Sequence, residues 1–567
     1  MERNEIMILT GADIVVETLI EQGTKTVFGY PGGQVINLYD ALYTRSDRIE
    51  HVLTAHEQGA AHAADGYARA TGEVGVCIAT SGPGATNLVT GIATAMLDSI
   101  PLVAITGNVP NSLIGKDSFQ EVDITGVTLP ITKHNFLVKS IDKLADTIRE
   151  AFAIAKSGRP GPVLVDIPKD VQVATFPYEP SLVVEKKLPK PAKHDKLKAA
   201  VQMIAESQKP YIYFGGGAVS ADISEEIIAL ADKIDAPIGC TMMGLSLIPV
   251  KNPRFLGMEG MHGHYASSVG QDEADLIITI GARFSDRATG NVAKYARHAK
   301  IIHIDGDRAE LNKNINVDLG ISCNIKNALQ RLLPLIGETK HPEWMARIEE
   351  LKREEQEQFE KVTAKDRITP YALIQEVAKH TNPDTPIVTD VGQHQMWVAQ
   401  YYPFEVPRTF ISSGGLGTMG FGLGAAIGAA KATGKKTVLF TGDGSFGMNL
   451  NELATAVTEN SPLVIIIMNN KVLGMVRQWQ TLFFQKHYSN TDLHTRKTDF
   501  VKLADAFGMK GYRVNELSEM ESVISQAFNE NCPVLVDVAI YEDEFVLPML
   551  PPGGSIEEII TERSDQS

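Results

Sequence analysis

The feature that most constrains the fold of this 567-residue chain is a series of short apolar runs rich in β-branched residues. Most runs are continuous rather than alternating, and many are followed by a glycine-rich turn and an amphipathic stretch. Continuous apolar runs are typical of strands buried on both faces, as in parallel sheets covered by helices. We therefore predict an α/β protein with parallel sheets throughout. The predicted strands span residues 26–29, 74–79, 102–106, 163–167, 211–214, 276–280, 301–304, 387–391, 438–441, 464–468 and 534–538.

Two stretches of the sequence are typical of connections between domains. Residues 176–196 are rich in Pro and Lys and show no helical period, whereas residues 337–365 are dense in Glu, Lys and Arg, which favours a solvated helix. They divide the chain into three blocks of domain size, of which the first and third are candidates for a shared fold. We expect domains at residues 1–180, 190–340 and 366–550, followed by a C-terminal tail at residues 551–567.

Charge and hydropathy argue against several classes of partner. The formal net charge is −16 and there is no basic tract, which disfavours binding to nucleic acid or to an anionic membrane. No apolar run approaches the roughly eighteen residues that a membrane-spanning helix needs. Residues 1–5 are acidic and lack the apolar core of a targeting peptide, so we expect a cytoplasmic protein.

The four cysteines indicate no zinc site. None belongs to a CxxC pair, and their neighbours are typical of buried strands or loops. We therefore expect inert core thiols in a reducing compartment. The cysteines are Cys77, Cys240, Cys323 and Cys532.

Polar residues follow two predicted strands in the third block. Gly442-Asp443-Gly444-Ser445 comes directly after one strand, and Asn469-Asn470 ends the next. Ligands of open α/β sheets bind at the carboxyl ends of strands. An Asp443 carboxylate, an Asn470 amide oxygen and one backbone carbonyl, at Val472, would leave room around Mg²⁺ for two diphosphate oxygens and a water. Two ordinary strand-end turns are the alternative, because both sequences are common in turns.

The second block contains weaker signs of a dinucleotide site. A glycine run at residues 215–217 follows a predicted strand and precedes a helix predicted at residues 221–234, and a helix N-terminus can hold a pyrophosphate. Asp305 ends the strand at residues 301–304, where an acid can bind ribose hydroxyls.

The spacing of the two motifs in the third block, with 24 residues between Gly444 and Asn469, is that of thiamine-diphosphate enzymes. Over nearly its full length the chain resembles the pyruvate-oxidase-like members of that family. Within them it most resembles the catalytic subunits of the biosynthetic acetolactate synthase (acetohydroxyacid synthase) family. The motifs that carry this resemblance lie at residues 28–33, 56–60, 80–87, 119–121, 159–163, 390–397 and 474–480.

The resemblance implies three doubly wound parallel-sheet α/β domains. The first binds the thiamine pyrimidine ring, the central one binds FAD, and the third binds thiamine diphosphate and Mg²⁺. Similar enzymes are dimers or larger, so we expect a homodimer or homotetramer with active sites between the first domain of one subunit and the third domain of another. A small regulatory subunit is also implied. The implied reaction joins pyruvate to pyruvate or 2-oxobutyrate with loss of CO₂, giving 2-acetolactate or 2-aceto-2-hydroxybutyrate for branched-chain amino acid biosynthesis.

Two sets of residues match the cofactor contacts of similar enzymes. Met419 matches the bulky residue that holds thiamine in a bent conformation, although a core methionine filling a gap is the alternative. An FAD-less domain of the same fold is the alternative for the second block. The thiamine diphosphate set is Pro31, Glu57, Gln393, His394, Gly417, Met419, Asp443, Gly444, Ser445, Asn470 and Met475. The FAD set is Arg159, Gly215, Gly216, Gly217, Thr241, Met242, Gly260, Met261, His262, Gly281, Arg283, Asp305 and Asn324.

Glu57 is the candidate for the central acid. In similar enzymes a carboxyl group hydrogen-bonds to the pyrimidine ring of thiamine and favours the tautomer that removes the C2 proton. Glu57 stands in the matching His-Glu-Gln-Gly segment, and the small residues after it suit close packing. A solvated glutamate on a helix surface is the alternative reading of this residue.

A further set matches substrate-binding residues. Arg287 matches the arginine that takes the carboxylate of the second 2-oxo acid, and a surface ion pair with Asp286 is the alternative. Trp479 would form an apolar wall that favours the extra methylene of 2-oxobutyrate by about 1–3 kcal/mol. Together with Glu57, the catalytic set is Gly33, Phe119, Gln120, Lys169, Arg287, Met475 and Trp479.

Five positions depart from the family pattern: Ala55, Asn108, Ser285, Asn324 and Gly424 stand where Arg, Gln, Asp, Asp and Pro are usual. The rival functions are a flavin-dependent pyruvate oxidase, a catabolic acetolactate synthase and a regulatory subunit that keeps the fold. The presence of Glu57 and Asp443 argues against the last. Residues 548–554 are turn-rich and form either a cover over the active site or a disordered tail.

Overall fold

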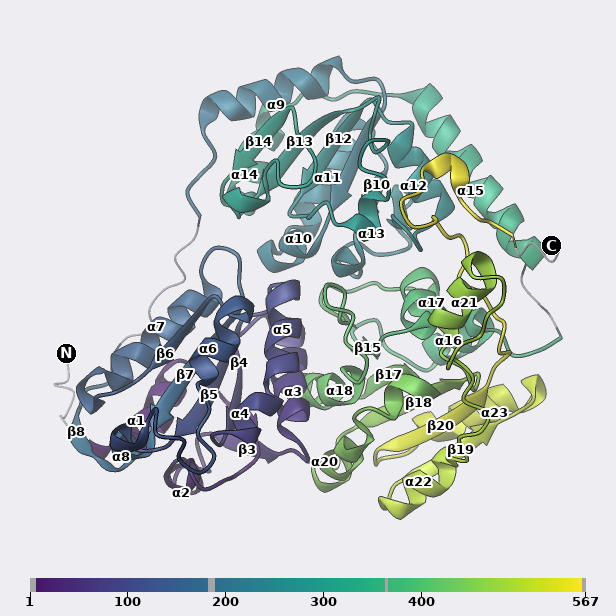
Figure 1. Ribbon diagram of the computed structural model, residues 1–567. Helices are drawn as coiled ribbons and strands as arrows, with labels where there is room; N and C mark the ends of the chain where they lie inside the picture. The colour runs from purple at the N-terminus through teal and green to yellow at the C-terminus, as the bar shows by residue number, and fades with distance from the viewer. Residues whose placement is uncertain (1–6, 182–188, 363–365, 563–567) are drawn as a thin grey trace.

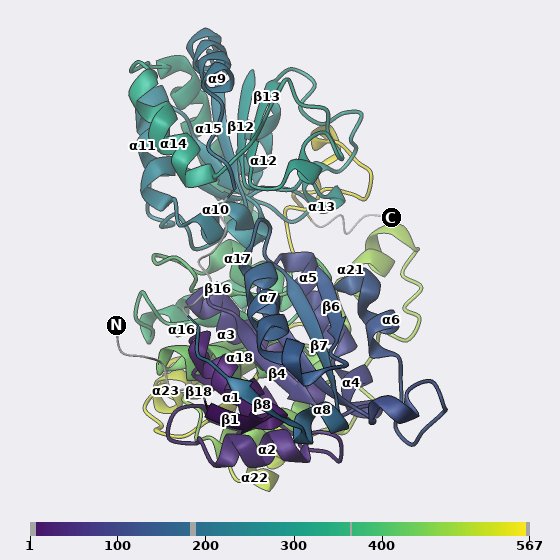
Figure 2. The same cartoon turned by 90° about the vertical axis from the view of Figure 1, so that its left-hand side faces the viewer.

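The computed structural model describes residues 7–181, 189–362 and 366–562, so the acidic N-terminus and the end of the tail lie outside the described residues. The described part of the chain forms three six-stranded sheets, in which all pairs are parallel, as predicted (Figure 1). A two-stranded antiparallel ribbon joins β1 (Met7–Thr10) to β8 (Thr175–Tyr178). Each six-stranded sheet and the helices that cover it are called a lobe, numbered in chain order as the first, central and third. Figure 2 shows the central lobe above the other two.

The first and third sheets share one topology. The strand order is β3-β2-β4-β5-β7-β6 in the first and β16-β15-β17-β18-β20-β19 in the third, which is the same order once each sheet is numbered from its own first strand. The predicted likeness of these two blocks is therefore confirmed. The first sheet contains β2 (Thr26–Gly29), β3 (Glu50–Leu53), β4 (Gly75–Ala79), β5 (Leu102–Asn108), β6 (His134–Leu137) and β7 (Pro162–Pro168). The third contains β15 (Ile387–Thr389), β16 (Phe410–Ile411), β17 (Thr437–Gly442), β18 (Leu463–Asn469), β19 (Lys510–Val514) and β20 (Val534–Ala539).

The central sheet has a different order, β11-β10-β9-β12-β13-β14. It places its first and fourth strands side by side at the centre, as in dinucleotide-binding folds, where the ligand lies beyond the carboxyl ends of those two strands. Its strands are β9 (Pro210–Phe214), β10 (Ile238–Cys240), β11 (Phe255–Met258), β12 (Leu276–Ile280), β13 (Lys300–Asp305) and β14 (Leu319–Ser322).

Two layers of helices cover the first sheet. On one face, α1 (Gly11–Glu21) and α7 (Leu144–Lys156) share an apolar cluster with the strands. On the other face, α3 (Glu57–Thr71) and α5 (Val89–Asp98) do the same. Because both faces are covered, every position of a central strand can be apolar, which explains the continuous runs in the sequence.

The first and third lobes meet where α3 packs against α18 (Gly422–Thr433). The contact is made by small residues: a side chain on Gly66 would overlap the backbone of Ala425, and one on Gly428 would overlap Ala63. Glycine at these positions lets the two helix backbones approach closely. The close packing predicted for the residues that follow Glu57 is thus found, and its partner is the third lobe.

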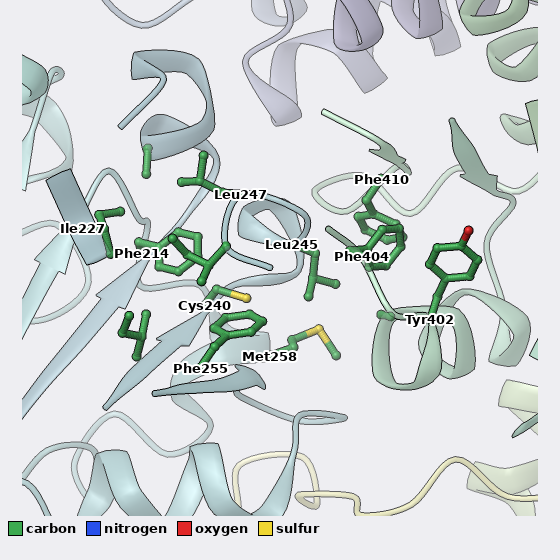
Figure 3. Packing of buried hydrophobic residues seen from close by; sticks show 14 of the residues in the cluster. Phe214, Ile227, Cys240, Leu245, Leu247, Phe255, Met258, Tyr402, Phe404 and Phe410 are labelled. Carbon is green, nitrogen blue, oxygen red and sulfur yellow. The ribbon is translucent and has the colours of Figure 1, made fainter. Parts of the chain in front are cut away.

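The central lobe is fixed to the third lobe by a shared apolar cluster (Figure 3). Leu245, in the loop that follows β10, lies between Phe214 of the central sheet and Phe404 and Phe410 of the third lobe, and Leu247 of the same loop lies beside Phe214. The backbone N–H of Val250 donates to the carbonyl of Phe404 (2.8 Å). These contacts hold the carboxyl ends of the central strands over the third lobe.

Two expectations about helices need correction. The glycine run after β9 opens a short helix, α10 (Gly216–Ala221), and the predicted long helix begins only at α11 (Ser224–Ile234), because Asp222 between them has a φ of 51°. The charged stretch forms α15 (Pro342–Val362) as predicted, but Trp344 on this helix is 2% exposed. The helix is therefore amphipathic rather than wholly solvated.

Candidate functional site

The predicted diphosphate residues gather at the carboxyl end of the third sheet, beside the point where its strand order reverses. Asp443 begins α19 (Asp443–Phe446) after β17, and Gln393 begins α17 (Gln393–Tyr401) after β15. The Ser445 hydroxyl donates to the carbonyl of Val391 (3.2 Å) and so ties the two turns together. In sheets of this order, ligands bind at this reversal.

Asn470 and Val472 follow the next strand and complete the same corner. The Asn470 amide nitrogen donates to Gln393 Oε1 (3.4 Å), and the N–H of Val472 donates to Asn470 Oδ1 (3.3 Å). Gln393 in turn donates to Gln478 Oε1 (3.0 Å) on α21 (Gly474–Phe483). The turn after β18 is thereby held against the helix that carries Met475 and Trp479.

The chemistry of this corner fits a magnesium ion shared with phosphate. Burial, reinforced by the charge of Asp537, raises the pKa of Asp443 to about 7, while backbone hydrogen bonds and Arg496 oppose the shift. The positive charge near this carboxylate does not compensate for its burial. Among the described residues, no group of three or more His, Cys, Asp or Glu side chains is placed to hold a metal ion by itself. A site with one carboxylate and one amide is typical of Mg²⁺ that takes its other ligands from a phosphate group and water.

His394 and Met419 shape the same region. Burial lowers the pKa of His394 to about 3, and its Nε2 has no hydrogen-bond partner among the described residues. The loop that contains Met419 is anchored by Gly420, whose N–H donates to Asp390 (2.9 Å) at the end of β15. Met419 is half-buried, and Gly417 beside it adopts a φ of 68° and lines the large cavity described below.

The Glu57 group lies at the carboxyl end of the first sheet. Glu57 is half-buried at the start of α3, and the Asn87 side chain donates to its carboxylate (2.9 Å). Lys169 donates to the carbonyl of Gly33 (3.0 Å) on the same edge, where Pro31 is exposed. Phe119 is 85% exposed.

The sequence-predicted catalytic residues thus fall into separate groups within one chain. In the described part of the chain no hydrogen bond or ion pair joins Glu57 to Asp443, and Glu57 does not line the large cavity. Gln120 lies beside the turn of Gly82 near Glu57, with a φ of 59°. Within one chain these residues therefore form two open groups, one at the carboxyl end of the first sheet and one at that of the third.

A cavity of about 1840 Å³ opens between the three lobes. It lies beyond the carboxyl ends of β9 and β12, where the order of the central sheet reverses. All predicted FAD residues line it except Gly215 and Gly260. The predicted residues that do so are Arg159, Gly216, Gly217, Thr241, Met242, Met261, His262, Gly281, Arg283, Asp305 and Asn324.

The walls of this cavity fit a dinucleotide. A Cβ atom on Gly217 would lie 2.8 Å from the Cα of Gly281, so the two glycine turns stack without side chains. Thr241 Oγ1 and His262 Nδ1 are buried and have no hydrogen-bond partner within the described residues. Burial, with the charge of Arg159 nearby, lowers the pKa of Arg283. Such a shift is expected where buried positive charge is not fully paired with negative charge.

Some of the predicted FAD residues already have partners in the protein. Arg159 pairs with Glu310 (2.6 Å) and donates to Ser99 (2.7 Å). Asn324 caps α14 (Ile325–Leu332) through a hydrogen bond from the N–H of Asn327 (2.8 Å). Asn324, where Asp is usual, therefore serves as a helix cap, and Asn and Asp are equivalent in that role.

Residues of two lobes meet at the other end of the cavity. Arg287, on α13 (Asp286–Thr289), places its guanidinium 5.8 Å from the ring centroid of Trp479 on α21. Met475 and Val476 of the same helix also line the cavity. The alternative ion pair with Asp286 is present too, at 3.8 Å, but both side chains are more than half exposed, so it is worth little.

Sequence reasoning missed two buried acids. Glu452 accepts backbone N–H groups from Ala55 (3.2 Å) and His56 (3.0 Å), directly before Glu57. Ala55, which stands where similar enzymes have Arg, is therefore held in place through its backbone N–H group. Glu259 lines the large cavity and is described below. No local sequence signal distinguishes these glutamates, because their surroundings come from distant parts of the chain.

The structure also bears on the C-terminal segment and on the cysteines. The segment after β20 packs against the central lobe, where the N–H of Leu550 donates to the carbonyl of Met261 (2.7 Å). Three of the cysteines are buried, whereas Cys532 is partly exposed. In the described residues, no helix is both long and apolar enough to cross a membrane.

Comparison with known proteins agrees with this geometry. Three family models match: the N-terminal TPP binding domain of thiamine pyrophosphate enzymes at residues 9–127, their central domain at residues 197–332, and their C-terminal TPP binding domain at residues 390–538. The third match begins at Asp390 and includes all the predicted diphosphate residues that gather at the third sheet.

Curated relatives match along almost the whole chain. The probable acetolactate synthase large subunit of Methanocaldococcus jannaschii is 46% identical over 97% of this chain and 95% of its own length. The large subunit of acetolactate synthase isozyme 2 of Escherichia coli is 46% identical over 98% and 100%, and that of isozyme 3 is 42% identical over 99% and 100%. The chain therefore belongs to the acetolactate synthase large subunits of the thiamine pyrophosphate enzyme family.

Proposed function

We propose that the chain joins pyruvate to a second pyruvate or to 2-oxobutyrate with loss of CO₂, giving 2-acetolactate or 2-aceto-2-hydroxybutyrate, in the cytoplasm. The observation that carries the proposal is the meeting of Arg287 and Trp479 from different lobes in one cavity. A guanidinium binds a carboxylate through two parallel hydrogen bonds, and the indole offers an apolar wall for the alkyl group.

The metal and diphosphate are held at the third sheet. Asp443, Asn470 and the carbonyl of Val472 bind Mg²⁺, and the turn at Gly444 lets backbone N–H groups approach the diphosphate. When bound, thiamine diphosphate supplies the carbon nucleophile for 2-oxo acids. Glu57, held by Asn87, shares a proton with the pyrimidine ring.

The complete site needs two copies of the chain, so the working form is a homodimer or homotetramer. The Glu57 group and the Arg287–Trp479 cavity are separate in one subunit, and exposed apolar side chains such as Phe119 and Val476 lie beside them. A second copy that covers these residues brings the two groups together. Gly33, Gln120 and Lys169 then approach the substrate from the first lobe of one subunit.

The large cavity between the lobes holds FAD, with a structural role, because the net reaction transfers no electrons. The unpartnered Thr241 and His262 atoms and the partly uncompensated Arg283 support this assignment. We assign the pyrimidine-binding, FAD-binding and diphosphate-binding domains to residues 1–180, 190–340 and 366–550, with the tail at 551–567. A small regulatory subunit joins the assembly, as the large-subunit names of the relatives suggest.

The test is a product assay. The purified chain is incubated with thiamine diphosphate, Mg²⁺, FAD and pyruvate, with and without 2-oxobutyrate, and both acetohydroxy acids are measured. The proposal expects 2-acetolactate from pyruvate alone and a predominance of 2-aceto-2-hydroxybutyrate in the mixture. Acetate or acetyl phosphate, formed with reduction of the flavin, would instead identify a pyruvate oxidase.

A further inference from the structure

A second, smaller cavity lies between the end of α12 (Tyr265–Asp272) and the C-terminal segment. Its volume is about 40 Å³, which is room for roughly three water molecules. Leu550 and Ile559 of the C-terminal segment cover it, and Glu259 forms part of its wall. Glu259 also lines the large cavity, so this residue stands between the two.

Several polar atoms at this place are buried without partners. Glu259 is 6% exposed, and neither of its carboxyl oxygens has a hydrogen-bond partner within the described residues. The same is true of Gln271 Nε2 and of the Tyr295 hydroxyl, which line the small cavity as well. Buried polar groups in native proteins are almost always paired with protein or ordered water. We therefore expect a bound partner for these atoms.

The unpartnered set contains both donors and acceptors. Gln271 Nε2 can only donate, whereas the Tyr295 hydroxyl can donate and accept. Burial raises the pKa of Glu259 well above its usual value, and the Tyr213 hydroxyl nearby opposes this without completing a hydrogen bond. A protonated carboxyl group also both donates and accepts.

Water matches this set better than a cation does. A cation would satisfy the oxygen atoms but would leave the N–H group of Gln271 unpaired. Lys294 lines the same cavity and donates to Ser555 (3.1 Å), so positive charge is already present. Water molecules can satisfy each donor and acceptor, and the site is both polar and large enough for them.

We propose that this cavity binds a cluster of internal water molecules, which joins the carboxyl group of Glu259 to Gln271 and Tyr295 beneath the C-terminal segment. Glu259 is then a hydrated acid in the wall of the large cavity. The proposal does not rest on the cofactor assigned to the large cavity, and it stands if that assignment fails.

The first test is a crystal structure of the full-length holoenzyme, with a second crystal soaked in a thallium salt to reveal cations. The proposal expects ordered water within hydrogen-bond distance of Glu259, Gln271 and Tyr295, and no thallium signal in the cavity. It is overturned by an empty cavity, by thallium bound there, or by a direct hydrogen bond from Gln271 to Glu259.

Variants give a test in solution. Glu259→Gln keeps a neutral polar group, and the infrared difference between wild type and this variant at neutral pH should show the loss of one protonated carboxyl band. The matched control is Glu376→Gln, because Glu376 is equally buried but pairs with Lys379 (2.7 Å). That control should remove a carboxylate band instead. Loss of a carboxylate band from Glu259→Gln would overturn the proposal.

Discussion

Arg287 and Trp479 are the residues on which we propose that substrate choice depends. They are 5.8 Å apart, from guanidinium carbon to ring centroid, although 191 residues separate them in the chain. Neither residue type is diagnostic by itself, since arginine and tryptophan both have many structural roles. Both line one cavity together with Met475, and this supports the common role that we propose for them.

Replacing Trp479 by Leu should reduce the preference for 2-oxobutyrate over pyruvate as the second substrate. The wall that contacts the extra methylene would be smaller, and such a contact is worth about 1–3 kcal/mol, or roughly 5- to 150-fold in the product ratio. The ratio of the two acetohydroxy acids from mixed substrates measures the effect. Phe176→Leu on β8 is the control, since Phe176 is partly exposed and does not line the cavity. An unchanged ratio in Trp479→Leu would remove Trp479 from the acceptor pocket.

Glu259 gives a prediction about pH. Its pKa is raised in the folded protein, so the unfolded chain ionises first and the free energy of unfolding falls as pH rises above about 4.5. The groups that influence or face it are Tyr211 and Tyr213 on β9, Cys240 on β10, Tyr295, and Asp272 and Lys294 of the small cavity.

Glu259→Gln should remove this loss of stability. Chemical denaturation at pH 5 and pH 8 should show a variant that gains stability relative to wild type as the pH rises. A difference between the two proteins that does not change with pH would mean that Glu259 is ionised in the folded state.

The sequence predicted some residues of the candidate site and could not predict others. Asp443 and Asn470 could be predicted from the sequence because each directly follows an apolar strand. Parallel strands bring such ends together. The role of Glu452 could not be predicted from the sequence, because the N–H groups from which it accepts hydrogen bonds lie almost 400 residues earlier in the chain. Its role depends on how α3 packs against the third lobe.

At the scale of elements, the strands predicted from apolar runs are all present, and they include the central strands of each sheet. The strands that sequence reasoning missed include both edge strands of every sheet. β19, for example, has one buried residue among five. An edge strand has fewer buried positions, so it lacks the continuous apolar run. Strand order also escapes such reasoning, because it depends on contacts between distant segments.

The glycine turns after β9 and β12 give a prediction at this scale. Gly281 has a φ of 56°, and a Cβ atom there would lie 2.6 Å from the backbone nitrogen of Ala218. Gly281→Ala should therefore destabilise the central lobe by about 1–3 kcal/mol and lower the amount of FAD that the purified protein carries. Thermal unfolding and the flavin absorbance measure the two effects.

Gly337→Ala is the matched control, because no atom lies within 4 Å of the Cβ position at Gly337. It should leave both the unfolding temperature and the flavin content unchanged. Equal behaviour of the two variants would show that the turn at Gly281 tolerates a side chain and does not position the cofactor.

At the scale of the whole molecule, the shared topology of the first and third sheets places one open group of site residues on each. Glu57 stands on the first and Asp443 on the third, and within the described chain they are not in contact. We propose that two subunits complete each other's sites, with Glu57 from one and Asp443 from the other.

The most direct test is subunit complementation between Glu57→Gln and Asp443→Asn, each of which should be inactive alone. When the two are co-expressed in equal amounts, half of the dimers are mixed and each mixed dimer contains one intact site, so acetolactate formation should return to about a quarter of the wild-type rate. If each chain contained its own complete site, no combination would restore an intact site. A mixture that stays inactive, although mixed dimers form, would contradict the account.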